Sequence, residues 1–114
     1  MTTSTAEDMN SHAVLLDLIT GIVAIENESL PELQAIVTGI QIDSRRLRKG
    51  DLFIAYFGRN HDGRDFIADA IQQDVAAVLA ESGSEWQGIR VVDGKLVVAI
   101  DNLTAKISEI AARF

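Results

Sequence analysis

Apolar residues recur at helical spacing in three stretches of this chain. An apolar residue at every third or fourth position lies on one helix face, and this periodicity predicts helices over residues 12–20, 66–71 and 102–114. Gly21 is suited to end the first helix. The candidate N-caps, in chain order, are Ser11, Asp65, and either Asp101 or Asn102.

Shorter apolar runs are typical of β-strands. They span residues 37–42, 52–57, 75–80, 89–92 and 96–100. The run 52–57 (LFIAYF) is apolar throughout, which indicates a strand covered on both faces. Asp93-Gly94 favours a tight hairpin between the last two runs, and a wider turn is the alternative. Residues 24–36, with the only proline, are predicted to form a connection with room for one helical turn.

Strands alternate with helices along the chain. This order predicts an α/β fold in which helices flank a mixed, largely parallel sheet. The 114 residues suffice for one domain. Residues 1–10 are small and polar and are expected to be a flexible N-terminus. The domain is therefore placed at residues 11–101, followed by the helix of residues 102–114.

The composition excludes several classes of protein. Because the chain has no cysteine, a disulfide scaffold and a thiolate metal site are excluded, and a reducing cytoplasm is consistent with it. The net charge of −7 is opposite to that of a typical nucleic-acid or anionic-membrane binder. No apolar run approaches the ~18 residues that span a bilayer, and the acidic N-terminus lacks the basic region of a secretory signal. We expect a cytoplasmic protein with no nucleic-acid or membrane partner.

Positive charge is concentrated in one window of the sequence. Residues 44–64 hold six basic and two acidic residues, a net +4, and the rest of the chain holds four basic and fifteen acidic residues, a net −11. The basic residues lie in two glycine-containing loops, DSRRLRKGD and GRNHDGRD, on either side of the strand 52–57. Loops at strand ends bind anions in α/β folds, because backbone N–H groups can approach phosphate oxygens there. The window therefore indicates an anion site, with a solvated basic surface as the alternative.

The motifs of common catalytic sites are absent from the sequence. The string nearest to a phosphate loop, residues 88–96 (GIRVVDGKL), has one residue too many between its glycines and a leucine where Ser or Thr is needed. His12 and His61 have no companions at metal-ligand spacing. Ser44 follows Asp43, but no motif places a histidine to activate it. The residues thus predict a binding module, or a piece of an enzyme whose reactive centre lies elsewhere.

Several short motifs follow one another in a fixed order between residues 42 and 81. D-S-R stands at 43–45, K-G-D-L-F at 49–53 and G-x-x-x-D-G at 58–63. An F-I…A-I helix and a V-A-A-V-L strand come next. In this order and spacing, which covers about the middle third of the chain, the string resembles the N-terminal domain of the Mur ligases. It is most similar to the MurE type, which adds the third amino acid to the UDP-N-acetylmuramyl-dipeptide precursor of peptidoglycan.

The resemblance implies the substrate-binding domain of an ATP-dependent, amide-bond-forming ligase. Such a domain holds the UDP part of UDP-MurNAc-L-Ala-D-Glu. A central domain with the ATP phosphate loop would follow the helix 102–114, and a C-terminal domain would close over the incoming amino acid, expected to be meso-diaminopimelate. ATP and Mg²⁺ are therefore expected for the full-length ligase and no cofactor for this piece. The piece alone is expected to bind without catalysis, and no residue is assigned as catalytic or metal-ligating.

The family's nucleotide contacts transfer to five positions of this sequence. They are Ile42, Ser44, Arg59, Asn60 and His61. The last three depart from the family's usual pattern, which resembles His-Gln-Ala, but the spacing to Asp62-Gly63 is kept, so the backbone contacts are expected to persist. A side chain such as Arg59 can add a direct phosphate contact.

Two neighbouring residues and the function itself have alternatives. For Asp43, a carboxylate that caps its own turn is favoured over a ligand contact, whereas Arg45 either pairs with an acid or contacts the ligand. The nearest alternative function is the MurF type of ligase, which adds the terminal dipeptide. A regulatory or protein-interaction domain of the same fold, whose basic loops would meet an acidic partner, is the alternative from another class.

Overall fold

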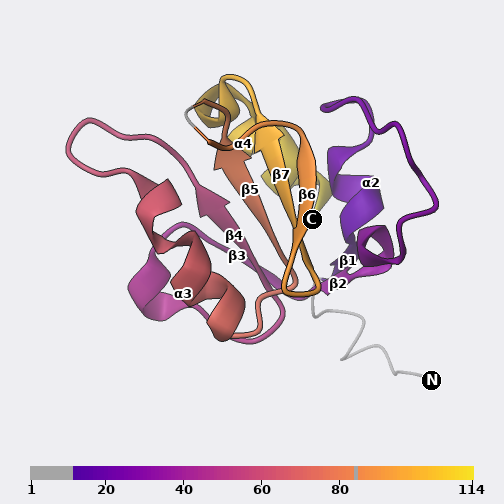
Figure 1. Ribbon diagram of the computed structural model, residues 1–114, viewed down its shortest axis with the longest axis horizontal. Helices are drawn as coiled ribbons and strands as arrows, with labels where there is room; N and C mark the ends of the chain where they lie inside the picture. The colour runs from indigo at the N-terminus through magenta and orange to yellow at the C-terminus, as the bar shows by residue number, and fades with distance from the viewer. Residues whose placement is uncertain (1–11, 84) are drawn as a thin grey trace.

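A five-stranded sheet forms the centre of the molecule (Figure 1). The computed structural model describes residues 12–83 and 85–114. The sheet has the order β3-β4-β5-β7-β6, and only β6 is antiparallel to its neighbour. Its strands are β3 (Gly39–Gln41), β4 (Asp51–Ala55), β5 (Ala77–Glu81), β6 (Ile89–Val92) and β7 (Lys95–Ile100). The predicted α/β class with a mixed, largely parallel sheet is confirmed.

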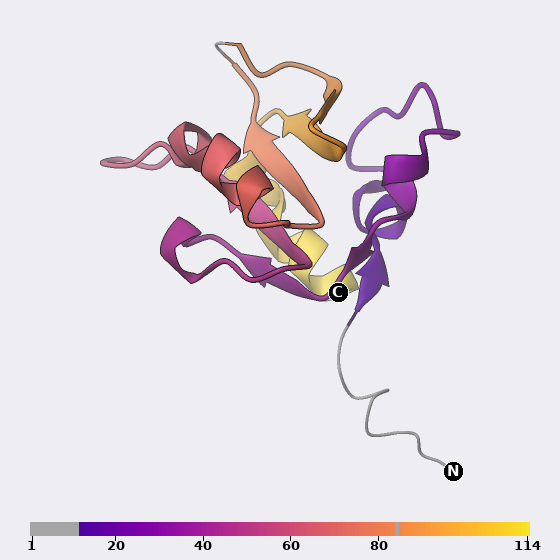
Figure 2. The ribbon, with the colours of Figure 1, turned by 60° about the horizontal axis from the view of Figure 1, so that its bottom comes forward.

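Helices cover both faces of this sheet (Figure 2). In β4, Leu52 and Ile54 join the cluster that contains residues of α2 (Leu15–Ile19) and α4 (Leu103–Arg113). Phe53 and Ala55 join the opposite cluster, with residues of α3 (Ile67–Gln72). Because successive strand residues point to opposite faces, a strand buried on both sides is apolar at every position. None of the helices in the described ranges is long and apolar enough to cross a membrane.

The N-terminal part of the chain forms a small separate sheet. β1 (Ala13–Val14) pairs antiparallel with β2 (Ile36–Val37), and a 3₁₀ turn, η1 (Pro31–Gln34), precedes β2. The helix predicted over 12–20 is therefore shorter, because its first residues extend to pair with β2. The strand predicted over 37–42 is divided between the two sheets at Thr38. Ser11, the candidate cap, lies outside the described residues.

The β6–β7 turn is the predicted tight hairpin, with positive φ angles at Asp93 and Gly94.

The N-terminus of α4 is held by a residue that is distant in the sequence. Asn102 stands at the N-cap position of α4, as predicted, but neither its side chain nor that of Asp101 makes the capping hydrogen bond. The carboxylate of Glu81, at the end of the neighbouring strand β5, accepts hydrogen bonds from the backbone N–H of Asn102 (2.9 Å) and of Leu103 (3.1 Å).

The helical segment that follows β4 begins at Gly63, one turn earlier than the predicted start at residue 66. A 3₁₀ helix, η3 (Gly63–Phe66), precedes α3, and its N-cap is Asp62 rather than Asp65. The Asp62 side chain accepts a hydrogen bond from the backbone N–H of Arg64, whereas α3 has no side-chain cap of its own. The local aspartate turn therefore decides where this helical segment starts.

Candidate functional site

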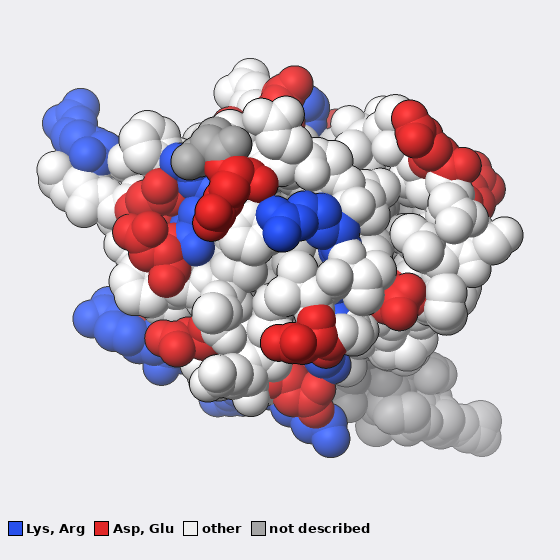
Figure 3. All heavy atoms as spheres, in the orientation of Figure 1, with Lys and Arg blue, Asp and Glu red and all other residues white. Residues whose placement is uncertain are grey.

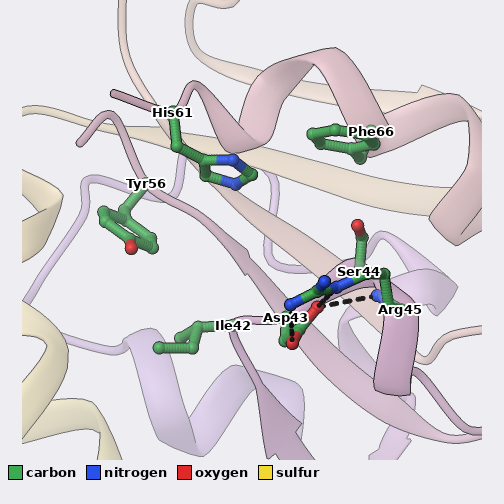
Figure 4. A pocket seen from close by; sticks show the side chains of 7 residues that line it. All are labelled: Ile42, Asp43, Ser44, Arg45, Tyr56, His61 and Phe66. Atoms are coloured by element: carbon green, nitrogen blue, oxygen red, sulfur yellow. Dashed lines mark hydrogen bonds and ion pairs between the residues drawn. The ribbon is translucent and has the colours of Figure 1, made fainter. Parts of the chain in front are cut away.

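A pocket lies where the chain leaves two neighbouring parallel strands. β3 and β4 are parallel and end at Gln41 and Ala55, so the loops that follow them meet at the carboxyl ends of the two strands. The cavity between these loops measures about 530 Å³. It is lined by Ile42, Asp43, Ser44 and Arg45 from the first loop, and by Tyr56, His61 and Phe66 from the second (Figure 4).

Asp43 organises the first loop. Its Oδ1 accepts hydrogen bonds from Arg45 N (2.9 Å) and Nε (3.0 Å), and its Oδ2 accepts one from Nη2 (3.0 Å). These bonds start the 3₁₀ helix η2 (Ser44–Arg46). The hydrogen-bonded Arg45 guanidinium lowers the pKa of Asp43 to about 2. The turn-capping role favoured for Asp43 is confirmed, and Arg45 pairs with this acid in the structure.

The backbone donors at the mouth of the first loop are partly occupied. The Gln41 side-chain oxygen accepts hydrogen bonds from the N–H groups of Ile42 (3.1 Å) and Asp43 (3.0 Å). The hydroxyl of Ser44, by contrast, makes no hydrogen bond within the described residues, and in Figure 4 it points toward Phe66. Ile42 is 46% exposed and forms an apolar wall. The loop thus offers a free hydroxyl beside an apolar surface.

Aromatic rings form the opposite wall. The His61 ring stacks on Phe66, with centroids 5.4 Å apart and an interplanar angle of 14°. Tyr56 lies on the other side of His61, at 6.1 Å and tilted by 45°. Tyr56 and Phe66 also pack against the two core clusters, which fixes their positions. The pocket therefore presents planar rings to a ligand, and two of these rings are held by the core.

The second loop is closed by its own backbone and by a second aspartate turn. Gly58 N–H donates to the carbonyl of His61 (2.7 Å), and Gly63 N–H donates to the carbonyl of Tyr56 (2.9 Å). Asp62 accepts hydrogen bonds from Arg64 N, Nε and Nη2 at 3.0, 2.8 and 2.8 Å. The Arg64 guanidinium lowers the pKa of Asp62 below its usual range.

Three of the five residues assigned from the sequence line the pocket. They are Ile42, Ser44 and His61. Arg59 and Asn60 lie on the same short loop as His61 but are exposed and do not line the cavity. Within the described residues, Arg59 makes no hydrogen bond or ion pair, so its guanidinium is available to a ligand.

Two lining residues, Tyr56 and Phe66, were missed by the sequence analysis. The sequence shows Tyr56 and Phe57 as the end of an apolar run, and this favours the core for both. Phe57 is in fact 57% exposed, and its ring lies 5.1 Å from the Arg64 guanidinium carbon. The usable signal was position, because β4 ends at Ala55 and side chains beyond a strand's carboxyl end leave the core.

Neither a metal centre nor a nucleotide phosphate loop is offered by these residues. In the ranges 12–83 and 85–114, no group of three or more His, Asp or Glu side chains is placed to hold a metal ion. The sequence contains no GxxxxGK[ST] string. The charges at the site are guanidinium groups held by carboxylates, together with the free Arg59, and such an arrangement is suited to an anionic ligand.

The sequence matches a known family over most of its length. The family described as "Mur ligase family, catalytic domain" matches residues 36–114, which include both aspartate turns and the pocket. The chain belongs to the Mur ligase family and corresponds to the N-terminal domain of its members.

Two similar proteins carry the same ligase name. The chain is 40% identical over 79 residues, 69% of its length, to the UDP-N-acetylmuramoyl-L-alanyl-D-glutamate–2,6-diaminopimelate ligase of Coxiella burnetii, and covers 16% of that protein. It is 34% identical over 109 residues, 92% of its length, to the ligase of the same name from Vibrio cholerae, and covers 21% of it. The chain thus spans at most about one fifth of these relatives.

The fold is also shared with a solved ligase. The crystal structure of MurF from Acinetobacter baumannii superposes with a TM-score of 0.67 over 90% of this chain and 21% of that one, at 16% sequence identity. At that identity the likeness concerns the fold alone. The sequence relatives are named as diaminopimelate ligases, and the structural neighbour is named MurF.

Proposed function

We propose that this chain is the substrate-binding domain of a ligase that adds the third amino acid to UDP-MurNAc-L-Ala-D-Glu, and that the pocket between the two aspartate turns binds the UDP moiety. The observation that carries the proposal is the convergence of Ile42, Ser44 and His61 on one cavity at the carboxyl ends of β3 and β4. The names of the relatives, which are diaminopimelate ligases, support meso-diaminopimelate as the added amino acid.

The chemistry of the pocket suits the two halves of UDP. A uracil ring needs an apolar wall and planar neighbours, which Ile42 and the His61–Phe66 stack supply. The free Ser44 hydroxyl can donate to or accept from a polar edge of the base. The diphosphate needs positive charge, and the unpaired Arg59 guanidinium on the adjacent loop provides it. Asn60 and His61 contribute contacts through their backbone.

Peptide-bond chemistry is assigned to other parts of the ligase. The sequence of this chain has no phosphate loop, so ATP and Mg²⁺ would be held by a central domain and the incoming amino acid by a C-terminal one. We expect the chain alone to bind substrate without hydrolysing ATP. The ligase would act in the cytoplasm, where UDP-linked precursors are made.

An ¹⁵N–¹H spectrum titrated with UDP tests the proposal. We expect saturable shifts clustered at residues 42–45 and 58–63, with uridine binding more weakly than UDP because it lacks the diphosphate. Arg59→Glu should weaken UDP binding about tenfold, equivalent to ~1.4 kcal/mol. Arg90→Glu, which makes the same charge change on β6, is the matched control and should leave the affinity unchanged. No saturable shift at millimolar UDP, or equal effects of the two variants, would contradict the assignment.

A further inference from the structure

One edge of the central sheet is open beside a group of basic residues. β3 stands at the end of the strand order and, within the described residues, pairs only with β4. One row of its backbone N–H and C=O groups therefore has no partner in the sheet, and such an edge is able to pair with another extended chain. The opposite edge is β6, the outer strand of the hairpin.

A groove of about 740 Å³ runs along this open edge. The backbone side of the groove is β3 and the residue before it, Thr38 to Gln41. Its other side is formed by Arg46, the last residue of η2, and by the loop that returns to β4, with Leu47, Arg48 and Lys49. The groove shares no lining residue with the pocket proposed for UDP. It is a second, separate cavity.

Three cations of this groove are exposed, and two of them have only a long ion pair with one acid each. The Arg46 side chain is 79% exposed, and its nearest acid, Asp43, is 3.9 Å away. The Lys49 side chain is 84% exposed, and its Nζ is 3.7 Å from Asp74. The Arg48 side chain makes no hydrogen bond or ion pair within the described residues. In Figure 3, basic groups stand at the left and lower margins of the molecule, with acidic groups between them.

The one acid that lines the groove is already used. Asp51 is 8% exposed, and its Oδ2 accepts a hydrogen bond from Arg48 N (2.8 Å). The carboxylate therefore holds the return loop in place. The groove as a whole remains positively charged.

The positions of the cations favour a partner that is a peptide. Charged residues on an edge strand itself hinder pairing with other strands, but here the cations lie on η2 and the loop after it, and β3 itself carries no charged residue. Leu47, in the middle of the loop, packs into the cluster on the α3 face of the sheet. A strand added beside β3 would direct every second side chain toward that face. Acidic residues at alternate positions would then meet the loop cations.

We propose that this groove binds an acidic peptide in extended conformation, which adds to β3 as a further strand and pairs its carboxylates with Arg46, Arg48 and Lys49. Backbone hydrogen bonds to an exposed sheet edge supply affinity in this mode of binding, and alternate side chains supply specificity. Because β3 has only three residues, we expect a weak complex, with a dissociation constant on the order of 0.1–1 mM. Because the groove and the UDP pocket share no lining residue, we expect the peptide to bind whether or not UDP is present.

The test uses three defined peptides in ¹⁵N–¹H titrations of the 114-residue chain. The first is a capped hexapeptide of alternating threonine and glutamate, which should produce saturable shifts at residues 38–41 and 46–49. The second has lysine in place of glutamate and should not bind. The third keeps the glutamates but has alternate backbone nitrogens methylated, which removes the hydrogen bonds along one edge, and it should bind at least about tenfold more weakly.

Arg48→Glu should weaken the binding of the first peptide at least about tenfold, and Arg48→Gln should weaken its binding less. The Arg48 side chain has no partner to lose, so both variants are expected to fold, which the dispersion of their spectra reports. Arg90→Glu, on the opposite sheet edge, is the control of equal charge change and should retain affinity. The proposal is overturned if no peptide gives saturable shifts, if the methylated peptide binds as tightly as its parent, or if Arg90→Glu acts like Arg48→Glu.

Discussion

The two loops that form the pocket contain the same hydrogen-bonded turn in different surroundings. Asp43-Ser44-Arg45 follows β3 and Asp62-Gly63-Arg64 follows β4. In each, the aspartate accepts bonds from the arginine backbone N–H, Nε and Nη2, and each turn starts a 3₁₀ helix. The Arg45 side chain is nevertheless 87% exposed, and that of Arg64 is 14% exposed.

The surroundings separate the roles of the two turns. The Arg64 Nη1 also donates to the carbonyl of Glu81 (3.3 Å), so the second turn is attached to β5. No comparable bond attaches Arg45 to another element in the described ranges. The first turn therefore lines the pocket, where a ligand can contact it. The second turn fixes the second pocket loop to the sheet. A local motif fixes a backbone shape, and the neighbours decide whether it serves binding or stability.

The middle residue of each turn gives the largest expected difference. A Cβ added at Gly63 would lie 2.9 Å from Ala55 Cα, a backbone atom of a buried strand that cannot move aside. Gly63→Ala should lower the free energy of unfolding by about 2–3 kcal/mol. Ser44→Ala, at the equivalent position of the first turn, should change it by less than about 0.5 kcal/mol. Urea denaturation of both variants measures the difference, and equal stabilities would refute the packing argument.

Replacing Arg64 should also lower the stability more than replacing Arg45, by a smaller difference than at the middle residues. Arg64→Ala leaves the half-buried Asp62 without its charged partner and removes the bond to β5, which should cost about 1.5–2 kcal/mol of stability. Arg45→Ala removes an exposed pair that water and salt largely screen, so it should lower the unfolding midpoint much less than Arg64→Ala does. If both variants lose the same stability, burial does not distinguish the two turns.

The smallest expected effect is a shift in titration. The pKa of Asp43 is about 2, against an ordinary value of 3.8, so its ionised form favours the folded chain. This contribution is complete above pH ~4 and is lost as the pH falls through about 2. In Arg45→Ala, the pKa of Asp43 should rise toward its ordinary value, as carboxyl ¹³C shifts would report. An unchanged pKa would show that Arg45 is not its cause.

Much of the fold could be predicted from local patterns. The run 52–57 was predicted as a strand covered on both faces, which is confirmed for residues 52–55, whereas Tyr56 and Phe57 lie beyond the end of β4. The Asp93-Gly94 hairpin was predicted from its turn residues and is confirmed. The caps were predicted less well. Glu81 caps α4 from 22 positions away, and only the parallel pairing of β5 with β7 brings it to that helix.

The candidate site was also predicted only in part, because some of its residues are brought to the pocket by contacts between distant segments. Ile42, Ser44 and His61 were assigned through a family resemblance, and the two-loop anion site was inferred from charge and glycine spacing. Tyr56 was missed because an aromatic residue in an apolar run has the same sequence signal in a core and at a pocket wall. The difference lies in whether the strand has already ended, which depends on pairing with its neighbours. Phe66 was missed because its helical spacing groups it with the core residues of α3, whereas it ends η3 and stacks on His61.

The sequence by itself determined the order of the elements, the two aspartate turns and the concentration of positive charge beside β4. These features depend on residue spacing and on bonds between residues two or three positions apart. Only the tertiary structure decided which turn is buried, which cations are free and where the sheet has an open edge. Each of these depends on contacts between distant segments, because burial and pairing are properties of the packed chain.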